Sequence, residues 1–276
     1  MAIFRESDDL RGSTFTGTDL SGSRFTEADL GGCRFSEANL SGVVMRGVEV
    51  RDADIDAPWL ADGGATFHIN GIDVAGYVEA ELDRRFPGRA QRRAADPEGL
   101  RAAWSLLQQT WAATMARAEA MSDGPADISA EISGGNSGDA LVDVSVHGEW
   151  SFAQTLRHLV FATDLWLGRS VLGRELPFHP LGLVGGGPEQ LGLDPSLFAD
   201  RTPAYAEVVE ARADRVAMVG DFLAAATAEE LAAVRRNPWH GRAETTLSCL
   251  HVILREEWDH HRFAARDLDV LQAKAG

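Results

Sequence analysis

The sequence predicts an α+β protein of more than one domain, with a repetitive N-terminal segment and a C-terminal four-helix bundle. Large apolar residues recur every five positions over residues 1–60. The pattern changes over 61–92, and from 93 onward apolar residues follow the three-and-four spacing of amphipathic helices. We therefore expect a repeat domain (1–60), a connector with one short amphipathic helix (61–92) and a helical domain (93–276).

Composition narrows the classes of function. The chain has 276 residues, of which 45% are hydrophobic and 25% charged, as in ordinary soluble globular proteins. Its net charge of −16 disfavours a nucleic-acid partner. There is no leader-like N-terminus and no apolar run of about 18 residues, so we expect a cytoplasmic protein without a membrane partner. Cys33 and Cys249 are too far apart in sequence to form a CxxC site.

The repeat is the strongest pattern in the chain, and small residues stand mostly two positions before each large one. The large residues are Leu10, Phe15, Leu20, Phe25, Leu30, Phe35, Leu40, Met45, Val50, Ile55 and Leu60. The segment resembles the pentapeptide-repeat family, most closely at Ala28-Asp29-Leu30 and Ala38-Asn39-Leu40. The resemblance implies a right-handed quadrilateral β-solenoid, with Cys33 as a small inward residue.

The length of this solenoid limits its role. Four repeats per coil give fewer than three coils, or a rod only about 12 Å tall. Some proteins of this family mimic DNA, but one duplex turn is about 34 Å long. We therefore favour a small cap that docks on its neighbour or mediates self-association, which leaves a homodimer open.

The helical domain has recognisable start and stop signals. A connector helix over 73–86 follows a short extended piece. Asp96 is the expected N-cap of the first long helix, which ends near Met121, and residues 141–146 read as extended. Ser151 is the expected N-cap of the second helix. A Gly- and Pro-rich loop over 173–203 precedes the third helix, which is expected from about Pro203 to Val234 with an interruption near Thr227. The fourth helix begins near Thr245.

The fourth helix carries two polar residues on its apolar stripe. The stripe is Leu247, Leu250, Leu254, Glu257, His261, Ala264, Leu268 and Leu271. Burying Glu257 and His261 requires compensating partners. Their Cβ atoms lie about 6 Å apart on a helix, and His158 of the second helix is a candidate third donor. The pattern leaves three alternatives: a divalent metal site, a Glu257–His261 pair on the helix surface, or a buried hydrogen-bonded pair with His158 satisfied nearby.

Two segments resemble the DinB/YfiT-like superfamily, namely Gly148-Glu149-Trp150-Ser151 through His158 to Val160, and Glu256 to Arg262. The resemblance implies an antiparallel four-helix bundle that binds a divalent metal through one histidine of the second helix and two residues spaced i, i+4 on the fourth. It assigns the ligands His158, Glu257 and His261. This His/Glu/His set is similar to that of mycothiol-dependent maleylpyruvate isomerase. Zn²⁺ is the expected metal, with Ni²⁺, Fe²⁺ or Mn²⁺ as alternatives.

The resemblance implies a metal-dependent transferase or isomerase that uses a low-molecular-weight thiol such as mycothiol, bacillithiol or glutathione, with a small-molecule substrate. Two other interpretations remain open: hydrolysis at the same metal site, or a non-catalytic metal-binding protein that acts through protein–protein interaction. The sequence assigns no general acid or base. Trp150 and Trp258 flank the expected ligands and are candidates for lining a pocket.

Overall fold

The computed structural model describes residue 4, residues 8–122 and residues 141–274. The chain divides into two compact units, Met1–Glu49 and Val50–Gly276. In the structure, the connector between the first unit and the long helices spans residues 50–93, because it also includes residues 50–60 of the expected repeat domain, and it belongs to the same compact unit as the long helices. None of the helices in the described ranges is long and apolar enough to cross a membrane.

The first unit repeats its backbone conformation as well as its sequence. Residues with positive φ recur every five positions: Gly12, Gly17, Gly22, Glu27, Gly32, Glu37, Gly42 and Gly47. Every ten residues a turn closes with a hydrogen bond, as from Ser13 N to Leu10 O at 3.1 Å. The side chain of Asp9, Asp19, Asp29 or Asn39 accepts a hydrogen bond from the backbone N–H two residues later.

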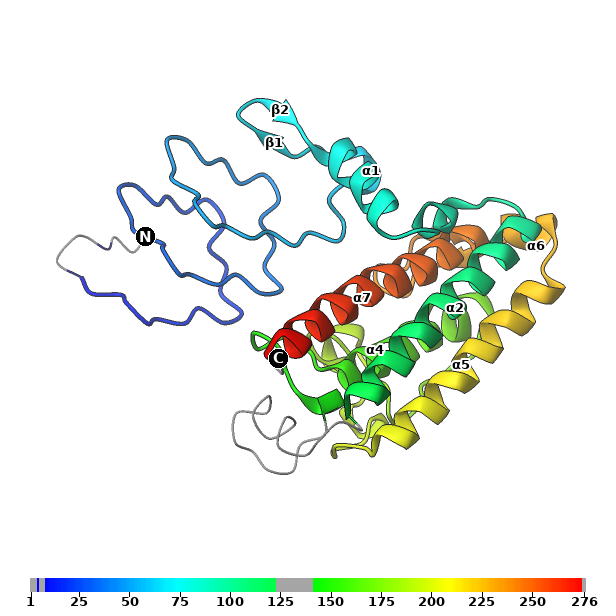
Figure 1. The fold of residues 1–276 in the computed structure, drawn as a ribbon. Coiled ribbons are helices and arrows are strands. Elements are labelled where there is room, and N and C mark those ends of the chain that lie inside the picture. The colour runs from blue at the N-terminus through cyan, green and yellow to red at the C-terminus, as the bar shows by residue number, and fades with distance from the viewer. Residues whose placement is uncertain (1–3, 5–7, 123–140, 275–276) are drawn as a thin grey trace. The chain divides into compact units, whose positions relative to one another are not determined.

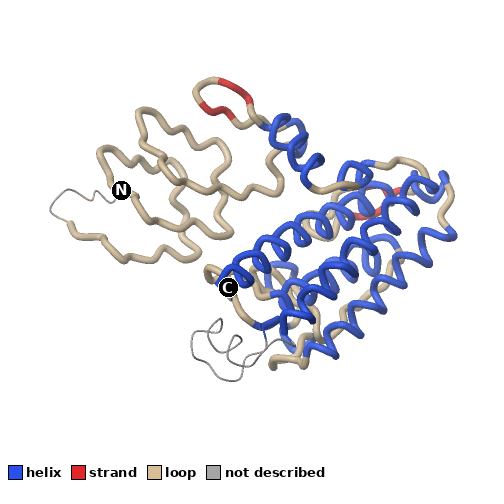
Figure 2. The backbone as a smooth tube through the Cα atoms, viewed as in Figure 1, coloured by secondary structure: helices blue, strands red, loops and turns tan. Residues whose placement is uncertain are grey.

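The expected closed core of this unit is not seen. Between Leu10 and Met45 the large residue of each repeat is 42–64% exposed. Cys33, expected to point inward, is also exposed. Figure 2 draws residues 8–49 as loops and turns, without a strand. The structure thus shows a pentapeptide periodicity of the backbone, and the stacked β-solenoid stays a prediction.

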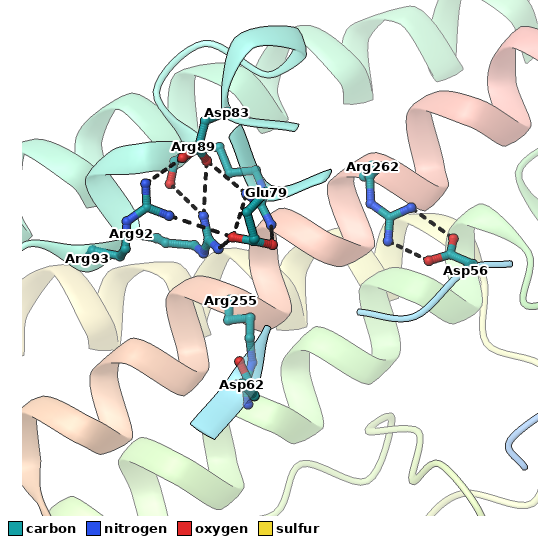
Figure 3. A network of polar contacts seen from close by, with 9 residues as sticks. All are labelled: Asp56, Asp62, Glu79, Asp83, Arg89, Arg92, Arg93, Arg255 and Arg262. Atoms are coloured by element: carbon teal, nitrogen blue, oxygen red, sulfur yellow. Dashed lines mark hydrogen bonds and ion pairs between the residues drawn. The ribbon is translucent and has the colours of Figure 1, made fainter. Parts of the chain in front are cut away.

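The connector contains a small hairpin and a helix. The 3₁₀ turn η1 (Asp62–Gly64) is followed by the antiparallel strands β1 (His68–Ile69) and β2 (Ile72–Asp73), then α1 (Ala75–Arg85) and η2 (Arg89–Arg93). Glu79 and Asp83, one turn apart on α1, pair with Arg89, Arg92 and Arg93 (Figure 3). Because Arg89 is only 2% exposed, this network fixes α1 against η2.

Four long helical segments of the second unit lie side by side (Figure 1). They are α2 (Pro97–Ser122), α4 (Phe152–Thr163) with its π-helical extension η4 (Asp164–Val171), α5 (Tyr205–Ala225) and α7 (Thr246–Lys274). Each of α2, α5 and α7 packs on its neighbours through one buried face. The largest fully buried side chains include Trp111 of α2, Leu156 of α4, and Trp258 and Ile253 of α7.

The predicted helix starts are confirmed closely, but the expected end of the third helix at Val234 is wrong, because Val234 begins a strand. Asp96 Oδ1 accepts from Gly99 N at 2.9 Å, which caps α2, and Ser151 and Gln154 form a capping box at the start of α4. The break near Thr227 separates α5 from α6 (Ala228–Ala232). Residues 141–143 form the 3₁₀ turn η3, so the expected extended stretch at 141–146 is wrong at its start.

The remaining elements shape the approach to α7. The long connection between η4 and α5 contains only the short 3₁₀ turns η5 (Pro188–Leu191) and η6 (Pro195–Leu197). The antiparallel strands β3 (Val234–Arg236) and β4 (Ala243–Thr245) form a hairpin directly before α7. The tip of this hairpin lies over the cavity described below.

Candidate metal centre

Three potential metal donors come together between α4 and α7. His158 Nε2 lies 3.5 Å from Glu256 Oε2, and His260 Nε2 lies 3.4 Å from the same oxygen. The donor atoms of the three residues all lie within 4.8 Å of one another. Glu256 and His260 are one turn apart on α7, so the two side chains project from the same side of that helix.

The spacing and chemistry of these donors fit a divalent metal. Tetrahedral zinc with bonds of about 2.1 Å separates its ligand atoms by about 3.4 Å. Both nitrogen–oxygen distances match that separation, whereas good hydrogen bonds between such groups are shorter, at about 2.7–3.2 Å. Two imidazoles and one carboxylate form a donor set suited to zinc and to other first-row divalent ions.

A carbonyl of the long connection orients His158. Its Nδ1 lies 3.1 Å from Leu183 O, so Nδ1 carries a proton that it donates to this carbonyl, and Nε2 points toward Glu256. The preceding residue reinforces this contact, because Arg157 Nε donates to Leu181 O and Arg157 O accepts from Leu183 N. Such an outer hydrogen bond fixes the tautomer and direction of a metal-binding histidine.

The protonation states also suit metal binding. Burial opposes ionisation of Glu256, but the contacts with His158 and His260 outweigh it and lower the pKa of the carboxyl. Burial lowers the pKa of His260, with an added contribution from His158, so its imidazole is neutral near pH 7. Divalent metals bind ionised carboxylates and neutral imidazoles.

Aromatic side chains cover the two imidazoles. The ring of Trp150 lies 4.6 Å from that of His158 and 5.8 Å from that of His260, centroid to centroid. Gly185 of the long connection lies against this pair, since a Cβ added there would approach Trp150 to 3.4 Å and His158 to 3.9 Å. The Gly185-Gly186-Gly187 run therefore brings backbone close to the donor group.

An open cavity of about 500 Å³ adjoins the donors. His158 and Glu256 line it at the donor end, and its other walls come from η4, the β3–β4 hairpin and the connector. The aromatic lining residues are Trp59, Phe161, Trp166 and Trp239. Its size and mixed lining are typical of a small-molecule site.

The structure does not bring Glu257 and His261 to His158. Glu257 is 1% exposed, as the stripe predicts, but Arg212 of α5 neutralises it: Arg212 Nη2 lies 2.6 Å from Oε1 and 2.5 Å from Oε2. His261 Nε2 lies 2.8 Å from Thr114 Oγ1 of α2, and burial lowers its pKa to about 4. The α7 residues that lie close to His158 are instead Glu256 and His260, each one residue earlier than the predicted ligands.

The physical reason is that α7 carries two Glu-x-x-x-His pairs about 100° apart around its axis. The pair on the apolar stripe points into the core toward α2 and α5 and finds protein partners there. Of the pair beside it, Glu256 lines the cavity, and both side chains lie near His158 of α4. Trp258 is buried against His261, so of the two expected pocket tryptophans only Trp150 contacts the donor group.

Comparisons with known proteins identify the family of the helical domain. The family model of the DinB superfamily matches residues 106–264, which is more than half of the chain and includes all three donors. The model of pentapeptide repeats matches residues 9–42 and 23–56, with eight copies. Searches of curated proteins and of solved structures found no match. On its sequence match and its helical domain, the chain belongs to the DinB superfamily and carries pentapeptide repeats at its N-terminal side.

Proposed function

We propose that His158, Glu256 and His260 hold one divalent metal, most suitably Zn²⁺, and that the protein is a transferase or isomerase acting with a low-molecular-weight thiol. The observation that carries the proposal is the placement of the donors at the end of an open cavity. Three protein donors leave a coordination position for an exchangeable ligand, whereas a structural zinc site has four protein ligands. Among the described residues, the donor group contains these three.

The metal supplies Lewis acidity, which lowers the pKa of a thiol bound to it. The protein orients the metal-binding side chains and gives the substrate access to them. Leu183 O and the Trp150 ring fix the direction of His158, and the Gly185 backbone lies against the His158 imidazole. The cavity accommodates a small-molecule substrate, for which the superfamily resemblance suggests mycothiol, bacillithiol or glutathione as the thiol partner.

We propose that His240 donates a hydrogen bond to a ligand in this cavity. It lines the cavity from the tip of the β3–β4 hairpin. Its Nδ1 accepts a hydrogen bond from Arg242 N at 3.2 Å, so the neutral ring carries its proton on Nε2. A histidine held in one tautomer presents its N–H to a ligand in a fixed direction.

The first unit is proposed to coil as a right-handed four-sided β-solenoid, and the long helices to form an antiparallel four-helix bundle. The five-residue recurrence of positive φ supports the four-sided coil, because it places a bend at the same position of each repeat. The packing of α2, α4, α5 and α7 supports the bundle.

The thiol role is tested with cobalt-substituted protein. Cobalt(II) bound to a thiolate gains a near-ultraviolet charge-transfer absorption. We expect this absorption on titration with glutathione or mycothiol, and its absence in the His260→Gln variant. Cobalt-loaded wild type that shows no spectral response to any thiol, but hydrolyses esters or amides, would replace the transferase proposal with a metal-dependent hydrolase.

A further inference from the structure

One wall of the cavity comes from the connector and not from the long helices. Trp59 of the connector and Trp239 of the β3–β4 hairpin both line it. Their side chains stay largely accessible, at 59% and 47% exposure. Exposed tryptophans are uncommon on protein surfaces without a partner, and they concentrate where one face of the ring meets a ligand.

Two ion pairs hold the connector to α7 on either side of Trp59. Asp56, three residues before it, makes a bidentate pair with Arg262 at 2.7 and 2.8 Å. Asp62, three residues after it, pairs with Arg255 (Figure 3). Between these contacts, Leu60 N donates to Ala57 O and Asp62 N donates to Trp59 O. The backbone that carries Trp59 is therefore a closed turn fixed at both ends.

Trp239 is held with similar precision. Asn237 Oδ1 accepts hydrogen bonds from Trp239 N at 2.9 Å and His240 N at 3.3 Å. Asn237 itself is 7% exposed, and its backbone N–H donates to Arg242 O. Both rim tryptophans are thus presented by constrained turns, which lowers the conformational entropy lost when a ligand binds.

The charges in the cavity indicate what kind of group these rings bind. Arg255 lines the cavity, but Asp62 neutralises it. Glu244 and Glu256 add negative charge to the same lining. An anionic group of a ligand would therefore gain little electrostatic binding energy at the rim. A flat apolar group, in contrast, can cover the exposed indole surface.

We propose that Trp59 and Trp239 bind a planar aromatic group of the small-molecule ligand, while the other end of that ligand reaches His158 and Glu256. This inference rests on the proposed function in one respect only, namely that the other end of the ligand binds at the metal donors. Asp56 and Asp62 act as positioning residues, because they hold the turn that carries Trp59.

The test is calorimetric titration of zinc-loaded protein with two thiols that differ by one ring, phenylmethanethiol and ethanethiol. We expect wild type to bind the aromatic thiol at least about tenfold more tightly. Trp59→Ala should remove most of that ratio while leaving zinc content and ethanethiol affinity unchanged, and Trp59→Phe should retain part of it. Tyr77→Ala is the matched control, since Tyr77 is an exposed aromatic residue of the same connector that does not line the cavity.

A second probe separates this inference from the metal proposal. Indole has no thiol, and we expect metal-free wild type to bind it and Trp59→Ala to bind it at least several-fold more weakly. This result supports the aromatic subsite even if neither thiol binds, an outcome that would count against the proposed function only. Equal indole affinity in wild type and Trp59→Ala, or no binding of indole by wild type, overturns the subsite. Weakened binding in Asp62→Asn with unchanged unfolding midpoint supports the positioning role.

Discussion

His158 Nε2 and Glu256 Oε2 lie 3.5 Å apart, although the two residues belong to different helices and nearly 100 positions separate them in the sequence. His260 approaches the same oxygen from the following turn of α7. A single carboxylate oxygen therefore stands between two imidazole nitrogens at the separation expected for ligands of one metal. The proposed metal site depends on this arrangement of the three side chains.

The Arg212–Glu257 pair should contribute to folding and not to metal binding. Arg212→Met leaves a buried carboxylate without a partner, and we expect it to lower the free energy of unfolding by about 3–5 kcal/mol. Adding Glu257→Leu should recover much of this loss, because the unpaired charge is removed together with its cost. Urea unfolding of wild type, the single variant and the double variant measures both effects. A double variant no more stable than the single one would contradict this assignment.

Gly185 should control how well His158 is held. A Cβ at this position would already contact Trp150 and His158, and valine would add two methyl groups beyond it. We expect Gly185→Val to weaken zinc affinity by about 10–100-fold, the range observed when support around a ligand is disturbed. Gly185→Ala should have a much smaller effect, since its Cβ makes ordinary contacts. Competition with a fluorescent zinc chelator gives both affinities, and equal affinities in all three proteins would argue against contact with the site.

Cys249 should make stability depend on alkaline pH. Burial raises the pKa of its thiol from 9.0 to about 11, with a further rise from Glu244. The folded state thus holds its proton more tightly than the unfolded state, and the resulting stability is present below pH 9 and lost as the pH rises through about 11. The loss is about 2–3 kcal/mol at most.

The measurement is the free energy of unfolding in urea at pH 8.5 and 10.5, compared between wild type and Cys249→Ala. The alanine variant should lose less stability over this interval, because it lacks the buried thiol. At pH 8, a thiol reagent should label the exposed Cys33 in the native protein and Cys249 only after unfolding. If the free energies of unfolding of the two proteins change equally between the two pH values, this role of Cys249 is excluded.

Ser151 and Gln154 should stabilise the start of α4. Ser151→Ala removes the hydroxyl that accepts from Gln154 N at 3.2 Å, and we expect a loss of about 1 kcal/mol. Ser151→Asp should retain most of the stability, since aspartate caps equally well. The midpoint of thermal unfolding should be highest for wild type, slightly lower for Ser151→Asp and lowest for Ser151→Ala.

Much of the helical unit follows from local sequence rules. Asp96, Ser151 and Thr227 mark helix starts because their short oxygen-bearing side chains cap free backbone N–H groups. The apolar stripe of α7 correctly predicts that Glu257 and His261 are buried. These features depend on neighbours within a few residues, which the sequence displays directly.

The partners of the buried groups do not follow from such rules. Periodicity shows that Glu257 enters the core, but the choice between a metal and Arg212 depends on the rotation of α5 against α7. The Glu256-x-x-x-His260 spacing is equally visible in the sequence, but the closeness of that pair to His158 emerges only when α4 is placed. Trp59 lies far from every predicted ligand in sequence and reaches the cavity because Asp56 and Asp62 bind α7.

The central claim concerns which Glu-x-x-x-His pair of α7 holds the metal, and metal content by mass spectrometry tests it most directly. Wild type purified without chelator or affinity metal should contain close to one divalent ion per chain. Glu256→Gln and His260→Gln should lose it, while Glu257→Gln and His261→Gln, the matched variants one residue away, should keep it in their folded fraction. Metal retained in the first two variants and lost in the second two would contradict the account.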